Sequence, residues 1–186
     1  MILIDTGPFV ALFDRQDTKH EKCKDTLKAI QEPLCTTIPV LTEAFHLLTP
    51  DSIGADRLRD FILDGGLTVW FMNHQAVVRA FELMEQYRDH PMDLAEASLI
   101  VAAESLRTTK VFTLDRTDFR TYRIRRGHRH IKAEIVGRSH TGPKNQKLDG
   151  PDSMVEENVQ TARLPIWNSF GSHDEKVDCA DDGLHG

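Results

Sequence analysis

The stretch Ile2-Leu3-Ile4-Asp5-Thr6-Gly7-Pro8, at residues 2–8, decides how the fold of this chain is interpreted. The apolar run at residues 1–4 is too short for a helix and is typical of a buried β-strand. Asp5 ends this run, and Pro8 suits the first turn of a following helix, where its missing N–H is not needed. The sequence therefore predicts a strand that leads directly into a helix, with a carboxylate at the junction.

The same pattern of strand followed by helix continues along the chain. Short apolar strands are predicted at residues 34–37, 67–71 and 111–114, and a last edge strand at residues 132–136. Helices are predicted between them, at residues 8–13, 17–30, 39–48, 52–63, 73–87 and 92–106. Such alternation is typical of a parallel sheet with helices on both faces. We therefore predict an α/β fold with three layers, α/β/α, around a central parallel sheet of about four to five strands.

Length and composition limit the class of protein. The chain has 186 residues, of which 40% are hydrophobic, enough for one domain with a core and an appendage. No run of about 18 apolar residues predicts a membrane span, and the start lacks the basic region of a secretion signal. Cys23, Cys35 and Cys179 have no CxxC spacing, which suits a reducing compartment. We expect a cytoplasmic protein with no membrane partner, no disulfide framework and no structural zinc site.

Charge is spread unevenly along the chain. Residues 1–137 contain 18 Lys and Arg against 20 Asp and Glu, a net of −2, whereas residues 138–186 contain 5 against 9, a net of −4. A basic stripe within the first part reverses this sign. It can attract a phosphate backbone, although a solvated surface without a partner is the structural alternative. Its cations are Arg116, Arg120, Arg123, Arg125, Arg126, Arg129 and Lys132.

The composition after Gly137 predicts a domain boundary. Residues 139–150 are polar, and the remainder has few apolar residues outside Leu164-Pro165-Ile166-Trp167. Such a segment cannot bury enough apolar surface to offset the entropy lost on ordering. We predict a folded domain at residues 1–137 and a polar, acidic, poorly ordered tail at residues 138–186.

Five carboxylates occupy positions where a polar group is unexpected. Asp5 follows three aliphatic residues, Glu43 lies within an apolar helix, and Asp115 ends a strand. Asp93 and Glu96 are three residues apart in the first turn of a predicted helix, which places both on one face. Structural alternatives exist for all: a helix N-cap for Asp5 or Asp93, a capping box for Glu96, a turn at Asp115, and solvent exposure for Glu43.

These carboxylates predict a cation site when they are taken as a set. Functional residues of open parallel sheets lie at the carboxyl ends of the strands, so acids at strand ends and helix starts are expected to converge. Like charges in one cleft repel unless a cation lies among them. Oxygen ligands without a companion His or Cys favour Mg²⁺ or Mn²⁺. Such a site can activate water for attack on a phosphodiester.

Four stretches that carry these acids resemble, in their order and spacing, the PIN domain and within it the VapC-like toxins of prokaryotic toxin–antitoxin pairs. They are Ile-Leu-Ile-Asp-Thr-Gly-Pro at 2–8, Leu-Thr-Glu-Ala-Phe at 41–45, Met-Asp-Leu-Ala-Glu-Ala-Ser-Leu-Ile at 92–100 and Phe-Thr-Leu-Asp-Arg-Thr-Asp-Phe at 112–119. The resemblance covers roughly residues 1–136. It implies a PIN-like fold and an endoribonuclease that uses Mg²⁺ or Mn²⁺. It also implies a cognate antitoxin protein and a homodimer.

The resemblance also implies roles for individual residues. Asp5 matches the family's first acid, Glu43 the second and Asp115 the fourth, while Asp93 and Glu96 both remain candidates for the third. Asp5, Asp93, Glu96 and Asp115 are expected to hold the cation, and Glu43 to orient or deprotonate the attacking water. The basic stripe is expected to guide the RNA backbone. Accessory roles are predicted for Thr6, Thr113 and Asp118.

Two other classes of protein are alternatives to this hypothesis. A haloacid-dehalogenase-like phosphatase requires a second Asp two residues after Asp5, where Gly7 stands, and the paired acids and late Lys of a response-regulator receiver are not evident. A PIN-like RNA-binding or RNA-processing module with weak or no nuclease activity is the remaining alternative. No metal role is expected for His74, His90, His128 or His130.

Overall fold

The computed structural model describes residues 1–137, so the predicted tail at residues 138–186 lies outside the described residues. Residues 1–137 form a five-stranded sheet in the order β3-β2-β1-β4-β7, in which every pairing is parallel, and a separate two-stranded hairpin. The strands of the large sheet are β1 (Ile2–Ile4), β2 (Leu34–Thr37), β3 (Thr68–Trp70), β4 (Lys110–Phe112) and β7 (Glu134–Ile135). The predicted α/β fold with a parallel sheet is confirmed.

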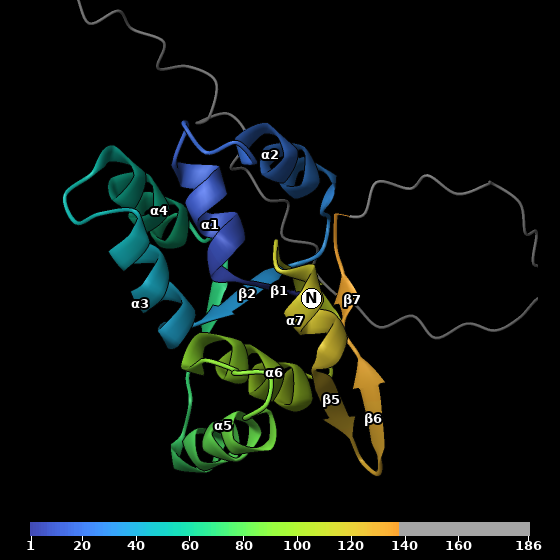
Figure 1. Cartoon of the computed structure of the whole chain (residues 1–186). Coiled ribbons are helices and arrows are strands. Elements are labelled where there is room, and N and C mark those ends of the chain that lie inside the picture. Colours follow the sequence, from blue (N-terminus) through green and yellow to red (C-terminus); the bar gives the residue numbers. More distant parts are fainter. Residues whose placement is uncertain (138–186) are drawn as a thin grey trace, which may run out of the picture. The chain divides into compact units, whose positions relative to one another are not determined.

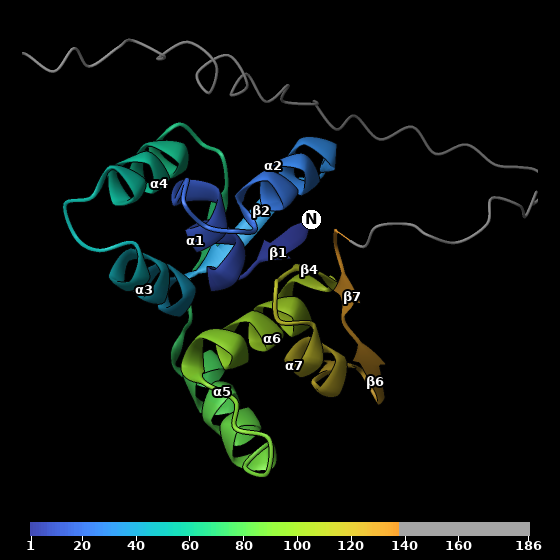
Figure 2. The same ribbon diagram turned by 45° about the horizontal axis from the view of Figure 1, so that its top comes forward.

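Helices cover both faces of the large sheet. The chain passes from β1 to β3 through α1, α2, α3 and α4, which lie on one face, and returns to β4 through α5 and α6 on the other (Figures 1 and 2). These helices are α1 (Thr6–Phe13), α2 (His20–Ala29), α3 (Ile38–Leu47), α4 (Ile53–Leu63), α5 (His74–Gln86) and α6 (Leu94–Leu106). The three-layer arrangement agrees with the prediction.

The core is centred on β1 and α6. All three residues of β1 are buried, as expected for a central parallel strand covered on both faces. α6 is buried along most of its length because it packs between α5, α3 and β2. Within residues 1–137, no helix is both long and apolar enough to cross a bilayer.

The strand order reverses direction beside β1. β2 and β3 lie on one side of β1, whereas β4 and β7 lie on the other. The β1–β4 register pairs Ile4 with Phe112, so the next residues along each strand, Asp5 and Thr113, are neighbours at the carboxyl edge. Ligands of open α/β sheets bind at such a switch point. The topology therefore places Asp5 and Thr113 where ligands bind in this class of sheet.

The basic stripe has a regular structure that the sequence did not predict. It consists of α7 (Arg116–Thr121) and a hairpin of antiparallel strands β5 (Arg123–Arg126) and β6 (Arg129–Lys132). The edge strand predicted at residues 132–136 was wrong at its start, because Lys132 belongs to β6 and only Glu134–Ile135 pair with β4. The hairpin has one fully buried residue, Ile124, which is too little apolar alternation to identify a strand.

Two helices begin later than predicted because aspartates form local turns. The Asp17 carboxylate accepts a hydrogen bond from the Lys19 backbone N–H at 2.6 Å, and α2 begins at His20 instead of residue 17. Asp93 adopts extended backbone angles and caps α6, which begins at Leu94. Short polar side chains compete with the helix in this way at its start.

Candidate acidic active site

Asp5 lies at the switch point and is almost completely enclosed, with 8% of its surface exposed. Its backbone N–H donates to the Phe112 carbonyl at 3.0 Å, which extends the β1–β4 pairing by one step. Oδ1 accepts from the Thr6 backbone N–H at 2.8 Å, and Oδ2 accepts from the Thr113 hydroxyl at 2.7 Å. The strand register and two threonine residues therefore position this carboxylate.

The surroundings of Asp5 disfavour its charge. The pKa of Asp5 is raised from 3.8 to about 6, mainly by burial and to a smaller extent by the carboxylates of Glu43 and Asp93, whereas the hydrogen bonds from Thr113 and Thr6 act to lower it. Thr6 links two of these carboxylates directly, because its backbone N–H donates to Asp5 and its hydroxyl donates to Glu43. Three acids distant in sequence thus influence one another at the carboxyl edge of the sheet.

Glu43 is tied to the start of α1. The Thr6 hydroxyl donates to Glu43 Oε2 at 2.6 Å across the packed helices α1 and α3. Glu43 is half-buried, so the structural alternative of a fully solvated side chain on α3 is wrong. The contact also shows that Thr6, predicted as an accessory residue, bridges Asp5 and Glu43.

Asp93 and Glu96 form a reciprocal capping box at the start of α6. Asp93 Oδ1 accepts from the Glu96 backbone N–H at 2.8 Å, and Glu96 Oε2 accepts from the Asp93 backbone N–H at 3.1 Å. The pKa of Glu96 is raised to about 7, mainly by burial and also by the charges of Asp93 and Asp118, whereas the hydrogen bonds from the Asp93 backbone and Tyr122 act to lower it. Both acids thus stabilise the helix start and remain close to other carboxylates.

Asp115 is exposed and caps α7. Its Oδ1 accepts from the backbone N–H groups of Thr117 and Asp118 at 3.0 and 3.1 Å, and its own N–H donates to the Thr113 hydroxyl oxygen at 2.9 Å. Thr113 therefore connects Asp115 to Asp5. Asp118 is half-buried and lies 2.7 Å from His90 Nε2.

The structure shows the structural alternatives of a helix cap for Asp5 and Asp93 and of a capping box for Glu96, and it places Asp115 at the cap of α7. It also links Asp5 to Glu43 through Thr6 and to Asp115 through Thr113. Among residues 1–137, no three acidic, His or Cys side chains are arranged closely enough to form a complete cation site. Four of the five acids nevertheless use only one carboxylate oxygen for hydrogen bonds within the described residues. The oxygens without such a bond are Glu43 Oε1, Asp93 Oδ2, Glu96 Oε1 and Asp115 Oδ2.

Tyr122 and His90 are neighbours of this site that the sequence analysis missed. Tyr122 is completely buried, yet its hydroxyl donates to Glu96 Oε2 at 3.0 Å. Burial and the Glu96 charge raise the pKa of Tyr122 far above its usual range. His90 packs against the Tyr122 ring and bonds to Asp118. No sequence signal identified Tyr122, because an aromatic residue between helix and strand is typical of a core.

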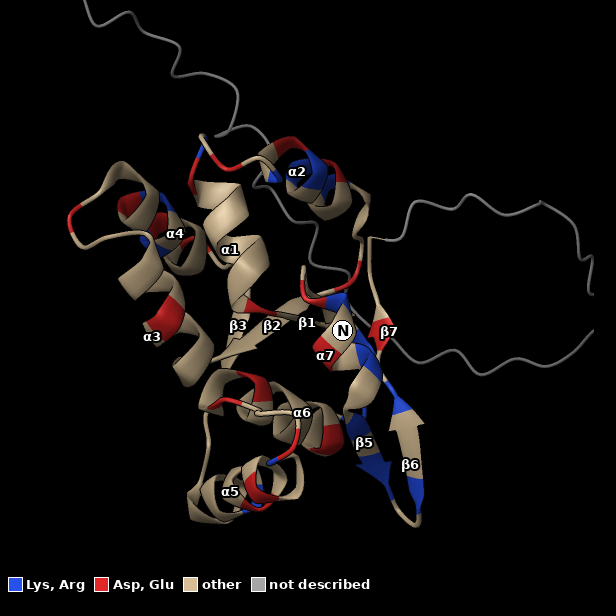
Figure 3. Ribbon diagram, in the orientation of Figure 1, with Lys and Arg blue, Asp and Glu red and all other residues tan. Residues whose placement is uncertain are grey.

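The cations of the basic stripe are not equivalent. Figure 3 shows Lys and Arg concentrated on the β5–β6 hairpin. The guanidinium groups of Arg116, Arg123 and Arg126 donate to backbone carbonyls, and that of Arg125 pairs with Glu104. Three cations make no side-chain hydrogen bond or ion pair within residues 1–137: Arg120, Arg129 and Lys132.

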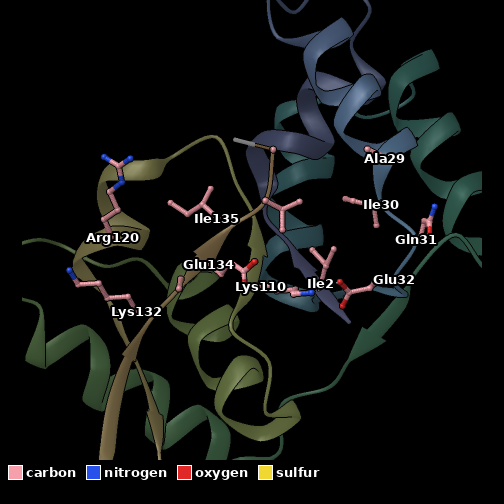
Figure 4. Close-up of a pocket in the computed structure, with 13 residues that line it drawn as sticks. Ile2, Ala29, Ile30, Gln31, Glu32, Lys110, Arg120, Lys132, Glu134 and Ile135 are labelled. Atoms are coloured by element: carbon pink, nitrogen blue, oxygen red, sulfur yellow. Dashed lines mark hydrogen bonds and ion pairs between the residues drawn. The ribbon is translucent and has the colours of Figure 1, made fainter. Parts of the chain in front are cut away.

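A cavity of about 890 Å³ lies along β7 and is separate from the acids. Arg120 and Lys132 line one side of it, and the Lys110–Glu32 ion pair lines the other (Figure 4). None of the five predicted acids lines this cavity. The cavity is therefore distinct from the site of the five acids, and its own lining includes the carboxylates of Glu32 and Glu134 as well as three cations.

The chain combines motifs in a fixed order with a parallel sheet and with acids at the switch point of that sheet. These features are those of a known family. The PIN domain family matches residues 2–124, and the chain belongs to this family.

Two relatives are of the VapC type. Ribonuclease VapC26 of Mycobacterium tuberculosis (strain ATCC 25618 / H37Rv) is 27% identical over 129 residues, which are 66% of this chain and 92% of the relative. The crystal structure of Mycobacterium tuberculosis VapC20, described as a Sarcin-Ricin loop cleaving toxin, aligns with a TM-score of 0.59 and 18% identity over 63% of this chain and 92% of VapC20. The likeness to VapC20 supports the fold. The chain is distantly similar to VapC ribonucleases.

Proposed function

We propose that this PIN-domain protein is a metal-dependent endoribonuclease that hydrolyses RNA phosphodiester bonds, and that it is the toxin of a type II toxin–antitoxin pair. One observation carries the proposal: Asp5 is buried at the switch point, and Glu43 and Asp93 approach closely enough to raise its pKa. Asp5 is buried, Glu43 is half-buried and Asp93 is exposed, and repulsion between such neighbouring carboxylates is relieved when a cation is bound among them. The similarity to VapC26 supports RNA as the substrate.

The donor set fits Mg²⁺ or Mn²⁺. Every candidate ligand is a carboxylate oxygen, the type that these hard cations prefer, and Asp93, Glu96 and Asp115 each keep one oxygen without a hydrogen bond from residues 1–137. We assign cation binding to these three acids and Asp5. A bound cation would supply charge compensation and a more acidic water molecule.

The remaining residues position the reactants. Glu43 orients or deprotonates the attacking water, and the Thr6 hydroxyl holds its Oε2 so that Oε1 is available. The Thr113 hydroxyl holds Asp5 and accepts from the Asp115 backbone, which keeps the ends of β1 and β4 in register. We assign accessory positioning roles to Thr6 and Thr113, and also to Asp118 through its contact with His90.

RNA guidance is assigned to the basic stripe. Arg120, Arg129 and Lys132 are the members best suited to bind phosphate, because their charges are not engaged by residues 1–137. Arg116, Arg123, Arg125 and Arg126 retain their charge while they support the hairpin and its junctions. A phosphate backbone that crosses this surface gains affinity by releasing counterions.

Two protein partners complete the proposal. A cognate antitoxin and a second copy of this chain are expected to cover exposed apolar side chains, among which Phe71 is 71% and Phe81 is 55% exposed. Exposed apolar surface of this kind marks protein interfaces. The buried free thiols of Cys23 and Cys35 suit a reducing cytoplasm.

Cleavage of single-stranded RNA by the purified full-length chain tests the function. We expect cleavage with Mg²⁺ or Mn²⁺, its loss in EDTA, and its loss in Asp5→Asn. Asp25→Asn is the matched control, because Asp25 is an exposed carboxylate on α2, and this variant should cut like the wild type. Full activity of Asp5→Asn would refute the site. RNA binding without any metal-dependent cleavage would favour the alternative of an RNA-binding module.

A further inference from the structure

Tyr122 is held in a fixed position beside the acids. Its ring centroid lies 5.0 Å from that of Tyr87, 5.8 Å from that of His90 and 5.9 Å from that of Phe119, with edge-to-face geometry in each pair. The residue is completely buried, so the ring cannot turn aside without disrupting this aromatic cluster. The hydroxyl is therefore presented to Glu96 in one geometry.

Two donors converge on one oxygen of Glu96. The Tyr122 hydroxyl lies 3.0 Å and the Asp93 backbone N–H lies 3.1 Å from Glu96 Oε2. Within residues 1–137, no group donates a hydrogen bond to Oε1 of Glu96. A glutamate side chain has several rotatable bonds and loses rotational freedom when it is ordered. Two donors on Oε2 order this side chain before any ligand arrives.

We propose that Tyr122 is a positioning residue for the cation site: with the Asp93 backbone N–H it holds Oε2 of Glu96 and leaves Oε1 as the oxygen that accepts a divalent cation. This inference rests on the proposed function. Partners of this kind orient metal-binding groups, and their loss commonly costs about 10- to 100-fold in metal affinity or activity.

The aromatic cluster around Tyr122 also links the proposed cation site to α7. His90 Nε2 lies 2.7 Å from Asp118 Oδ1, and the His90 ring packs against Tyr122. α7 begins at Arg116, directly after Asp115. The aromatic cluster thus joins the start of α6, which carries Glu96, to the helix that Asp115 caps. A fixed Tyr122 therefore keeps Glu96 and Asp115 in a constant position relative to each other.

Tyr122→Phe tests the proposal, with Tyr87→Phe as the matched control. Both substitutions remove one hydroxyl from the same aromatic cluster. The Tyr87 hydroxyl oxygen accepts from the Arg123 backbone N–H at 3.0 Å and has no hydrogen bond to an acid within residues 1–137. Mn²⁺ binding by the full-length chain is measured by titration calorimetry, together with kcat and KM for single-stranded RNA and Tm in EDTA. We expect Tyr122→Phe to bind Mn²⁺ about 10-fold more weakly with unchanged KM for RNA, and Tyr87→Phe to bind Mn²⁺ like the wild type.

A double variant shows whether Tyr122 acts through Glu96. Glu96→Gln alone should weaken Mn²⁺ binding, and Tyr122→Phe in that background should weaken it no further, because coupled residues are not additive. Equal Mn²⁺ affinity of Tyr122→Phe and wild type overturns the proposal, as do an equal loss in Tyr87→Phe, additive losses, or a Tyr122→Phe chain that fails to fold. If the wild type binds Mn²⁺ and cuts RNA while Tyr122→Phe is unaffected, only this inference fails. A wild type that neither binds Mn²⁺ nor cuts RNA removes the proposed function as well.

Discussion

Asp5→Asn is expected to stabilise the metal-free protein at neutral pH while it abolishes RNA cleavage. The substitution replaces a buried carboxylate, whose charge is disfavoured by burial and by Glu43 and Asp93, with a neutral group of the same shape. Most substitutions of buried polar residues destabilise a protein. A gain in stability at the position to which we assign cation binding would therefore be a specific sign of electrostatic strain at this site.

The magnitude follows from the pKa of Asp5. The folded protein keeps the Asp5 proton up to about pH 6, whereas an unfolded chain loses it near the ordinary value of 3.8. The free energy of unfolding therefore falls as pH rises between these values and is constant above them. The difference corresponds to about 3 kcal/mol, with little discount for solvent because Asp5 is 8% exposed. An imperfect replacement of the bonds from Thr6 and Thr113 offsets about 1 kcal/mol, which leaves a net gain of about 2 kcal/mol for Asp5→Asn at pH 7.5.

Urea unfolding in EDTA at pH 4 and pH 7.5 measures this difference. Asp5→Asn should be more stable than wild type at pH 7.5 and no more stable at pH 4, where the folded wild type is protonated. The exposed control Asp25→Asn should change little at either pH. Added Mn²⁺ should stabilise the wild type by mass action and leave Asp5→Asn unaffected. An equal loss of stability for Asp5→Asn at both pH values would refute the electrostatic argument.

Three further predictions concern contacts around the site and the fold. Thr6→Val removes the donor to Glu43 and should lower kcat about 10-fold with a loss of about 1 kcal/mol in unfolding free energy; unchanged single-turnover cleavage would contradict this. Lys132→Gln should weaken RNA binding and reduce the slope of log affinity against log salt by about 0.7, whereas the α4 control Arg59→Gln should not, as measured by fluorescence anisotropy. Gly54→Ala places a Cβ 2.9 Å from a backbone carbonyl oxygen of α1, and the resulting overpacking should cost about 1–3 kcal/mol in urea unfolding. Wild-type stability of this variant would show that the helix can shift at no cost.

The central strands were predictable from the sequence because each is a short apolar run. All three residues of β1 are buried and apolar, and β4 buries Val111 and Phe112 after the partly exposed Lys110, so both strands contain adjacent apolar residues and are followed by a polar residue. The strand–helix order then limits the topology to a parallel sheet, and acids at strand ends are expected at its carboxyl edge. Asp5 could be placed in this way from its position in the sequence alone.

The basic stripe and the aromatic cluster were not predictable to the same degree. α7 has six residues and one buried side chain, Phe119, which is too short for a helical period to emerge. Each strand of the hairpin has one apolar residue among basic ones, Ile124 in β5 and its partner Ile131 in β6, which is too few to show an alternating pattern. Tyr122 has the sequence properties of a core residue, and only its packing reveals that its hydroxyl meets Glu96.

Outside the basic stripe, the local sequence determined which segments form strands and helices, because burial on both faces and the positions of Pro8 and the capping acids act over a few residues. Only the tertiary structure decided how Asp93 and Glu96 divide their contacts. Asp93 adds its charge to the surroundings of Asp5, while Glu96 turns one oxygen to Tyr122. The physical reason is that Coulomb forces and hydrogen bonds depend on distances in space, which are set when β1, α6 and α7 pack together.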